Sequence, residues 1–175
     1  MSNKTFEKVK SETRVLEKIT MLIPGFRGYK QKELRREADK LIRNHLNQRL
    51  TQSKEDLKLV FQHLVDNKLT DVWTDMDRLI TNLDAVASQI NHASYGYSGF
   101  YDAVKVQEKN LDAMLDYDEK LVDNIESLDE KAKQFKSEAL NGQFKDTRTH
   151  VKEIREIIDL LDRLYEERKN IILGV

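Results

Sequence analysis

Cysteine is absent from this 175-residue chain, and proline occurs only once. The lack of cysteine excludes a disulfide framework, a thiolate nucleophile and a zinc site built on cysteines. One proline and six glycines leave few helix breakers, while 35% of the residues are charged. This composition is typical of long helices with solvated faces rather than of sheets. We therefore predict a single all-α domain across residues 1–175.

Long apolar runs are also missing. No stretch approaches the roughly 18 apolar residues that a membrane-spanning helix needs. The opening segment, MSNKTFEKVKSE, lacks the continuous apolar core of a signal peptide. We expect a soluble, cytoplasmic protein.

Apolar residues recur every three or four positions along most of the chain, which predicts an elongated antiparallel bundle of about five helices with coiled-coil-like packing. Pro24 ends the first helix, and Asn141-Gly142 marks the last turn. Ser53 followed by Asp56 resembles a capping box, so we expect the second helix to bend or restart near residues 51–54. The predicted helices span about 5–22, 31–66, 71–93, 99–136 and 143–173.

The most function-like stretch begins at the proline. Phe26 and Tyr29 alternate with glycines there, and a basic helix follows directly. On a helical wheel, the cations of that helix line one side and its apolar residues the other. The four cations are Lys32, Arg36, Lys40 and Arg43.

A second aromatic–glycine segment, SYGYSGFYD, occupies residues 94–102. Because helices joined by short connections alternate in direction, we expect this segment and residues 24–31 to share one end of the bundle. Two interpretations stay open: the rings plug the end of the bundle, or both segments form a binding site. The candidate binding residues are Phe26, Arg27, Tyr29, Lys32, Arg36, Lys40, Arg43, Tyr95, Tyr97, Phe100 and Tyr101.

The net charge of −1 hides a strong asymmetry. Residues 1–66 carry 15 Lys/Arg against 9 Asp/Glu, whereas residues 67–141 carry 8 against 15. The two parts could pack against each other, or the basic part could attract an acidic partner.

Asp118 lies on the apolar side of its predicted helix, so we expect a buried carboxylate that needs a donor or an opposite charge. His45, also on an apolar stripe, is one conceivable partner, and tyrosines are others. We interpret Asp118 as a register-fixing contact rather than a catalytic group. The outer face of that helix carries a row of acids, which predicts a solvated face whose carboxylates are too spread out to hold a metal. They are Asp112, Asp116, Glu119, Asp123, Glu126 and Glu130.

Catalytic motifs are missing. The four histidines are scattered, and no metalloprotease, nucleophile-elbow, phosphate-loop or dinucleotide pattern occurs. We expect no enzyme activity, no cofactor, no metal and no small-molecule substrate. We predict a non-enzymatic interaction or scaffold module that binds a protein partner or itself through the two aromatic–glycine segments. The alternative is binding of RNA phosphates or of an anionic membrane through the basic helix start.

Two segments carry a resemblance. IPGFRGYKQKELRREADKLIR at residues 23–43 and ASYGYSGFYDAVKVQEKNLD at residues 93–112 resemble an uncharacterised family of small prokaryotic all-helical proteins. The resemblance implies a shared fold and a shared pair of segments, and it implies no activity, partner or functional residue.

Overall fold

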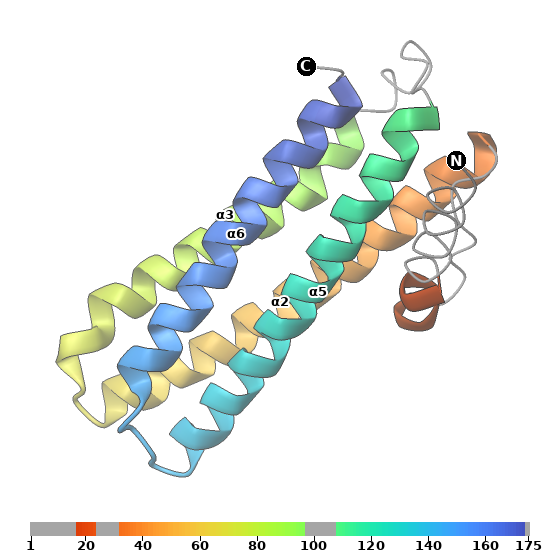
Figure 1. Cartoon of the computed structure of the whole chain (residues 1–175). Coiled ribbons are helices and arrows are strands. Elements are labelled where there is room, and N and C mark those ends of the chain that lie inside the picture. The colour runs from red at the N-terminus through yellow and green to blue at the C-terminus, as the bar shows by residue number, and fades with distance from the viewer. Residues whose placement is uncertain (1–16, 24–31, 97–107, 174–175) are drawn as a thin grey trace, which may run out of the picture.

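The computed structural model describes residues 17–23, 32–96 and 108–173 and shows an elongated, all-helical bundle (Figure 1). The long helices are α2 (Lys32–Asp66), α3 (Trp73–Gly96), α5 (Glu108–Leu140) and α6 (Thr147–Leu173). A single 3-10 turn, η1 (Thr70–Val72), precedes α3, and residues 17–22 are helical. The predicted all-α fold class is confirmed.

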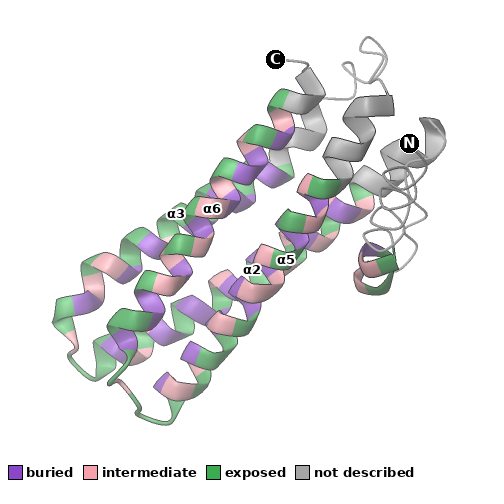
Figure 2. Cartoon of the chain, viewed as in Figure 1, coloured by how far each residue is buried: buried purple, intermediate pink, exposed green. Residues whose placement is uncertain are grey.

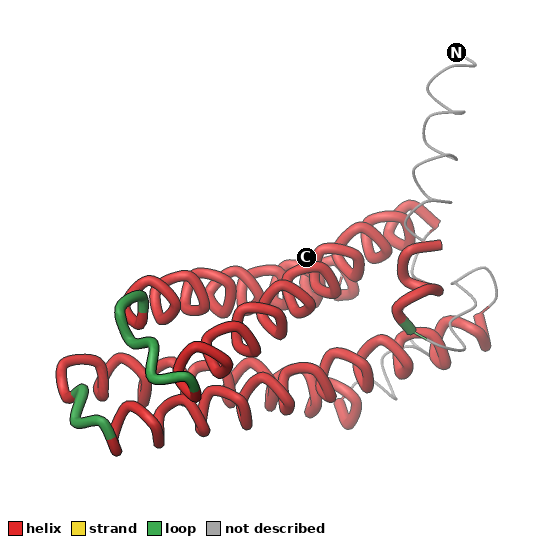
Figure 3. The backbone as a smooth tube through the Cα atoms, turned by 90° about the horizontal axis from the view of Figure 1, so that it is seen from below, coloured by secondary structure: helices red, strands yellow, loops and turns green. Residues whose placement is uncertain are grey.

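Consecutive long helices run in opposite directions, as predicted, so the two described connections between helices lie at one end of the bundle (Figure 3). Each long helix packs against two others: α2 against α3 and α5, and α6 against α5 and α3. The pairs α2–α5 and α3–α6 run parallel. Contacts between α2 and α5 accordingly join residues about 80 positions apart, as in Arg49–Asp129 and Asp56–Lys136.

The core forms where the apolar stripes of the helices meet (Figure 2). On α3, the predicted 3-4 spacing places Met76, Leu79, Leu83 and Ile90 in the interior, each with no exposed surface. Burying one such side chain fully stabilises the fold by about 1.5–3 kcal/mol. The stripes of α5 and α6 are buried in the same way, from Leu121 to Ala139 and from Val151 to Tyr165.

Helix α2 ends in a Schellman motif around Lys68. The Lys68 amide donates to the carbonyl of Val65 (2.9 Å), and the Leu69 amide donates to that of Leu64 (3.0 Å). Lys68 has a left-handed φ of 58°, which a side chain other than glycine adopts at a cost. Leu69 then packs on the core and brings the chain back toward α3.

Helix α5 ends in the same motif with glycine at the equivalent position. The Gly142 amide donates to Ala139 (3.0 Å), the Gln143 amide donates to Glu138 (2.9 Å), and Gly142 has a φ of 71°. The turn predicted at Asn141-Gly142 is therefore confirmed.

Several expected boundaries are displaced. α5 continues to Leu140, four residues past the predicted end, and α6 begins at Thr147 rather than at residue 143. The restart expected near residues 51–54 is wrong: α2 passes through as one helix, so Ser53 and Asp56 are not a capping box. Both are buried, with exposed fractions of 0% and 2%.

The two Schellman motifs offer a matched pair of substitutions. Lys68→Gly should raise the free energy of unfolding by about 0.5–1 kcal/mol, because glycine removes the strain of the left-handed conformation. The greater entropy that glycine gives the unfolded chain offsets only part of this gain. Gly142→Ala should lower it by about 1 kcal/mol, because no atom lies within 4 Å of the added carbon and only backbone strain acts. Urea denaturation of both variants checks this. A Lys68→Gly protein less stable than the parent would contradict the cap assignment.

Candidate functional site

The sequence-predicted binding residues fall into three groups in the structure. Lys32 and Arg36 lie in α2 and Tyr95 lies in α3, but their side chains are outside the description. Lys40 is exposed on α2, and Arg43 is half-buried there. The remaining predicted residues, Phe26, Arg27, Tyr29, Tyr97, Phe100 and Tyr101, lie outside the described residues.

The described helices fix where the two aromatic–glycine segments attach. The start of α2, the end of α3 and the start of α5 lie at one end of the bundle (Figure 1). We call this the attachment end. Upstream of residue 24, Ile19 and Ile23 are buried in the core. Lys18 Nζ lies 2.6 Å from a carboxylate oxygen of Asp123 and 3.6 Å from one of Glu119, so the chain is fastened to α5 just before the first segment.

A row of charge pairs joins α2 to α5, and we call it the α2–α5 seam. His45 Nε2 lies 3.0 Å from Glu126 Oε1, and Arg49 Nε lies 3.2 Å from the same oxygen. Arg49 also donates from Nη1 to Asp129 Oδ2 at 3.2 Å. One arginine therefore bridges two carboxylates on successive turns of α5.

Further along the seam, two carboxylates are buried. Asp129 Oδ2 also accepts from Lys133 (2.7 Å), while Asp56 Oδ1 accepts from Lys136 (2.7 Å) and Gln52 (3.2 Å). Asp56 and Asp129 are each 2% exposed, and the second oxygen of each carboxylate has no hydrogen-bond partner. A buried acceptor in this state is costly, so the seam depends on the cations that face it.

Ion pairs within the chain explain part of the charge asymmetry between residues 1–66 and residues 67–141. Cations of residues 1–66, namely Lys18, Arg49 and Lys54, pair with acids of residues 67–141. The acidic face of α5 is therefore not wholly a solvated outer face: Glu119 and Glu126 are half-buried, which corrects the prediction for these two, whereas Asp123 is exposed. These three side chains pair with basic residues of another segment because α5 turns this face toward α2 and residues 17–23.

Asp118 is buried as predicted, with no exposed surface. Its partner is Arg168 of α6, whose Nε lies 2.5 Å from Asp118 Oδ1, and not His45, which pairs with Glu126. Arg168 continues the spacing of Leu161 and Tyr165 on the apolar face of α6. A cation on an apolar stripe is the sequence signal that could have identified the partner of Asp118.

His150 is a further buried group that the sequence did not single out. Its ring stacks on Phe135 with centroids 4.8 Å apart, and Nε2 lies 2.7 Å from Glu138 Oε2. Gln134 donates to the same carboxylate at 2.9 Å. The Gln134 hydrogen bond, followed by that of His150, lowers the pKa of Glu138 below its usual value of 4.5. This cluster holds the end of α5 to the start of α6.

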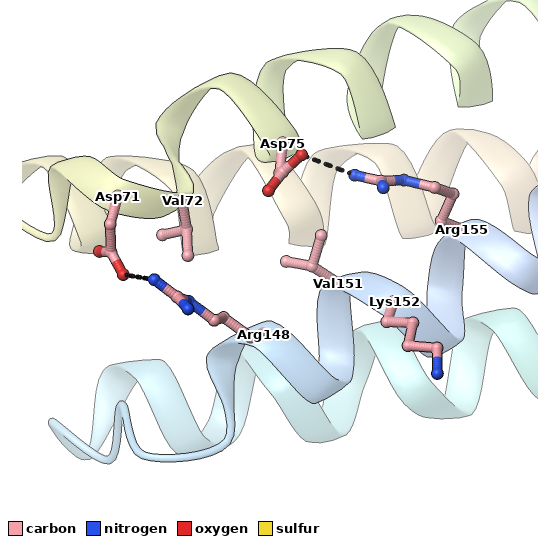
Figure 4. A pocket seen from close by; sticks show the side chains of 7 residues that line it. All are labelled: Asp71, Val72, Asp75, Arg148, Val151, Lys152 and Arg155. Atoms are coloured by element: carbon pink, nitrogen blue, oxygen red, sulfur yellow. Dashed lines mark hydrogen bonds and ion pairs between the residues drawn. The ribbon is translucent and has the colours of Figure 1, made fainter.

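A cleft of about 390 Å³ lies between the starts of α3 and α6 (Figure 4). Val72 and Val151, each 3% exposed, lie between its charged walls. Across the cleft, Arg148 Nη2 lies 2.7 Å from Asp71 Oδ2, and Arg155 Nη2 lies 3.0 Å from Asp75 Oδ1. The α3 wall is thus acidic and the α6 wall basic, with Lys152 adding a third cation to the latter.

Within residues 17–23, 32–96 and 108–173, no cluster of three or more His, Asp or Glu side chains is arranged to bind a metal ion. None of the helices in these ranges combines the length and apolar character needed to cross a bilayer.

Comparisons with protein-family models, with curated proteins and with solved structures find no match for this chain. Membership of the small prokaryotic helical family stays a prediction.

The buried Asp118–Arg168 pair predicts strong non-additivity. Arg168→Met alone should lower the free energy of unfolding by about 3–5 kcal/mol, because it leaves a buried carboxylate without its cation. The double variant Asp118→Leu/Arg168→Met should be at least as stable as the parent, since both buried charges of this pair are then removed. Urea denaturation of Asp118→Leu, of Arg168→Met and of the double variant measures the coupling free energy between the two side chains. Additive losses would show that the two side chains act independently.

The lowered pKa of Glu138 predicts an acid-labile contribution. Because the folded-state pKa is below the unfolded value, the contribution is present above pH 4.5 and is lost as pH falls through the folded pKa. The stability difference between the parent and Glu138→Gln should therefore be largest at neutral pH and shrink as the pH falls below 4.5. Gln134→Leu should make this stability difference smaller at neutral pH, because it removes the hydrogen bond from Gln134 to Glu138. Thermal unfolding across pH checks this, and a difference that grows on acidification would contradict it.

Proposed function

We propose that this protein is a non-enzymatic interaction or scaffold module that binds a protein partner, or a second copy of itself, through the attachment end. The aromatic–glycine segments, residues 24–31 and 94–102, supply the binding residues. Aromatic side chains are the commonest anchors of protein interfaces, with arginine beside them. The segments hold Phe26, Tyr29, Tyr97, Phe100 and Tyr101, together with Arg27.

One observation carries this proposal: the start of α2, the end of α3 and the start of α5, which adjoin the two segments, lie at one end of the bundle (Figure 1). Segments about 70 positions apart in the sequence are therefore tethered to one end of a rigid bundle. The burial of Ile19 and Ile23 adds to this, since it fastens the chain immediately before residue 24. Short segments fastened at their flanks lose less entropy when they bind.

The alternative is binding of phosphates, of RNA or of an anionic membrane, through the start of α2. Lys40 favours it, because this lysine is exposed on the basic helix. Pairs within the chain weigh against it, because Arg49 binds Asp129 in the seam and Lys54 binds Asp84 of α3. The protein interface is the function that we favour.

A capture experiment tests the proposal. The variant Phe26→Ser/Tyr29→Ser/Phe100→Ser/Tyr101→Ser, used as bait, should lose the proteins that the parent retains. The matched control is Leu59→Ser/Leu140→Ser, which removes two apolar side chains that are 46% and 54% exposed elsewhere on the surface. The control should retain the same proteins, and all three baits should have the same helical circular dichroism. Retention by the aromatic variant would contradict the proposal.

The same experiment separates the alternative by charge and salt. Phosphate binding predicts retention of RNA or anionic vesicles that weakens steeply between low and high salt and disappears in Arg36→Glu/Lys40→Glu. Lys145→Glu/Arg163→Glu is the matched control, since both of these cations are exposed on other parts of the surface. If the retained protein is unaffected by salt and by Arg36→Glu/Lys40→Glu, the alternative is wrong.

A further inference from the structure

The walls of the α3–α6 cleft carry opposite charges at matched heights. Asp71 faces Arg148, and Asp75 faces Arg155, across one groove between two parallel helices (Figure 4). These pairs are weak, because the side chains are 77% and 55% exposed in the first pair and 40% and 47% in the second. Their carboxylate and guanidinium groups therefore stay accessible to a second set of partners.

The charge pattern continues beyond the cleft, and each wall changes sign there. Arg78 follows Asp75 by three residues on α3, and Asp159 follows Arg155 by four on α6, so each continues its own wall. Both side chains are exposed. The α3 wall thus reads acidic, acidic, basic, while the α6 wall carries the three cations Arg148, Lys152 and Arg155, followed by the acidic Asp159.

Such a face is complementary to itself in one orientation. A two-fold axis running along the groove places α3 of one copy over α6 of the other at the same height. Asp71 and Asp75 then lie over the α6 wall of the second copy with its three cations, and Arg78 lies toward the end of that wall where the sign changes. An axis running across the groove instead places α3 over the α3 of the second copy. The acidic side chains of the two copies then lie opposite each other and repel.

We propose that the α3–α6 face is a docking surface for a second copy of this chain, related by a two-fold axis along the groove. The size of the face suits a dimer: helices of 24 and 27 residues present roughly 36 by 20 Å, near the ~800 Å² per partner of a standard interface. The exposed charge pairs make the association salt-sensitive. This surface is separate from the attachment end, so the proposal does not rest on the aromatic segments.

The test compares the parent with two variants by analytical ultracentrifugation at low and high salt. Arg148→Asp/Arg155→Asp makes both walls acidic and should weaken dimerisation by about tenfold or more, as expected for the loss of several exposed pairs. The exchanged variant, Asp71→Arg/Asp75→Arg/Arg148→Asp/Arg155→Asp, restores the pairs within each chain. It should dimerise like the parent, which keeps the test valid if the first variant unfolds.

Mixing reveals the orientation. With the axis along the groove, the parent and the exchanged variant place like charges over each other, so each should pair with itself and mixed dimers should be absent. A size tag on one protein distinguishes the mixed species. The quadruple aromatic variant of the attachment end should dimerise like the parent, which separates this proposal from the proposed function. A parent that stays monomeric at about 1 mM in ~20 mM salt, or one that pairs freely with the exchanged variant, overturns the proposal.

Discussion

The charged seam between α2 and α5 is the interaction on which the rest of the bundle depends. It joins two helices that run parallel, and it buries the carboxylates of Asp56 and Asp129 in their contact. Apolar stripes tolerate a shift of one helix along another, but a buried carboxylate that leaves its cation loses several kcal/mol, about 3–5 for a broken pair. We infer that the seam fixes the direction and register of α2 against α5. The α2–α3 and α5–α6 hairpins then follow from their short connections.

This arrangement decides which surfaces are left for binding. Arg49 pairs with Asp129 in the seam, and Lys54 pairs with Asp84 of α3, so part of the charge asymmetry of the chain is neutralised internally. We propose two surfaces for binding other molecules: the attachment end, which the aromatic segments adjoin in sequence, and the α3–α6 face, whose charge pairs are solvent-exposed. The first suits anchors that bury apolar rings, whereas the second suits a weak, salt-sensitive contact.

Periodicity predicted the fold because it is local: the stripes, the alternation of direction and the turn at Gly142 can be read from neighbouring residues. Burial of Asp118 was predictable for the same reason. Its partner was not, because Arg168 reaches it only through the packing of α5 on α6. Ser53 and Asp56 show the reverse error, since their spacing fits a capping box and tertiary contact with Lys136 overrides it. At the candidate site, the sequence supplied the residues and, from alternating helix directions, the prediction that the two segments share one end of the bundle.

Hydrogen–deuterium exchange of the full chain, alone and saturated with the protein that it captures, tests the functional account most directly. The account predicts slower exchange on binding at residues 24–31 and 94–102 together, and unchanged exchange along the seam around Arg49 and Asp129. Protection confined to residues 32–43 and abolished by salt would contradict it, because the basic face of α2 would then be the binding surface. Protection of neither segment would also contradict it.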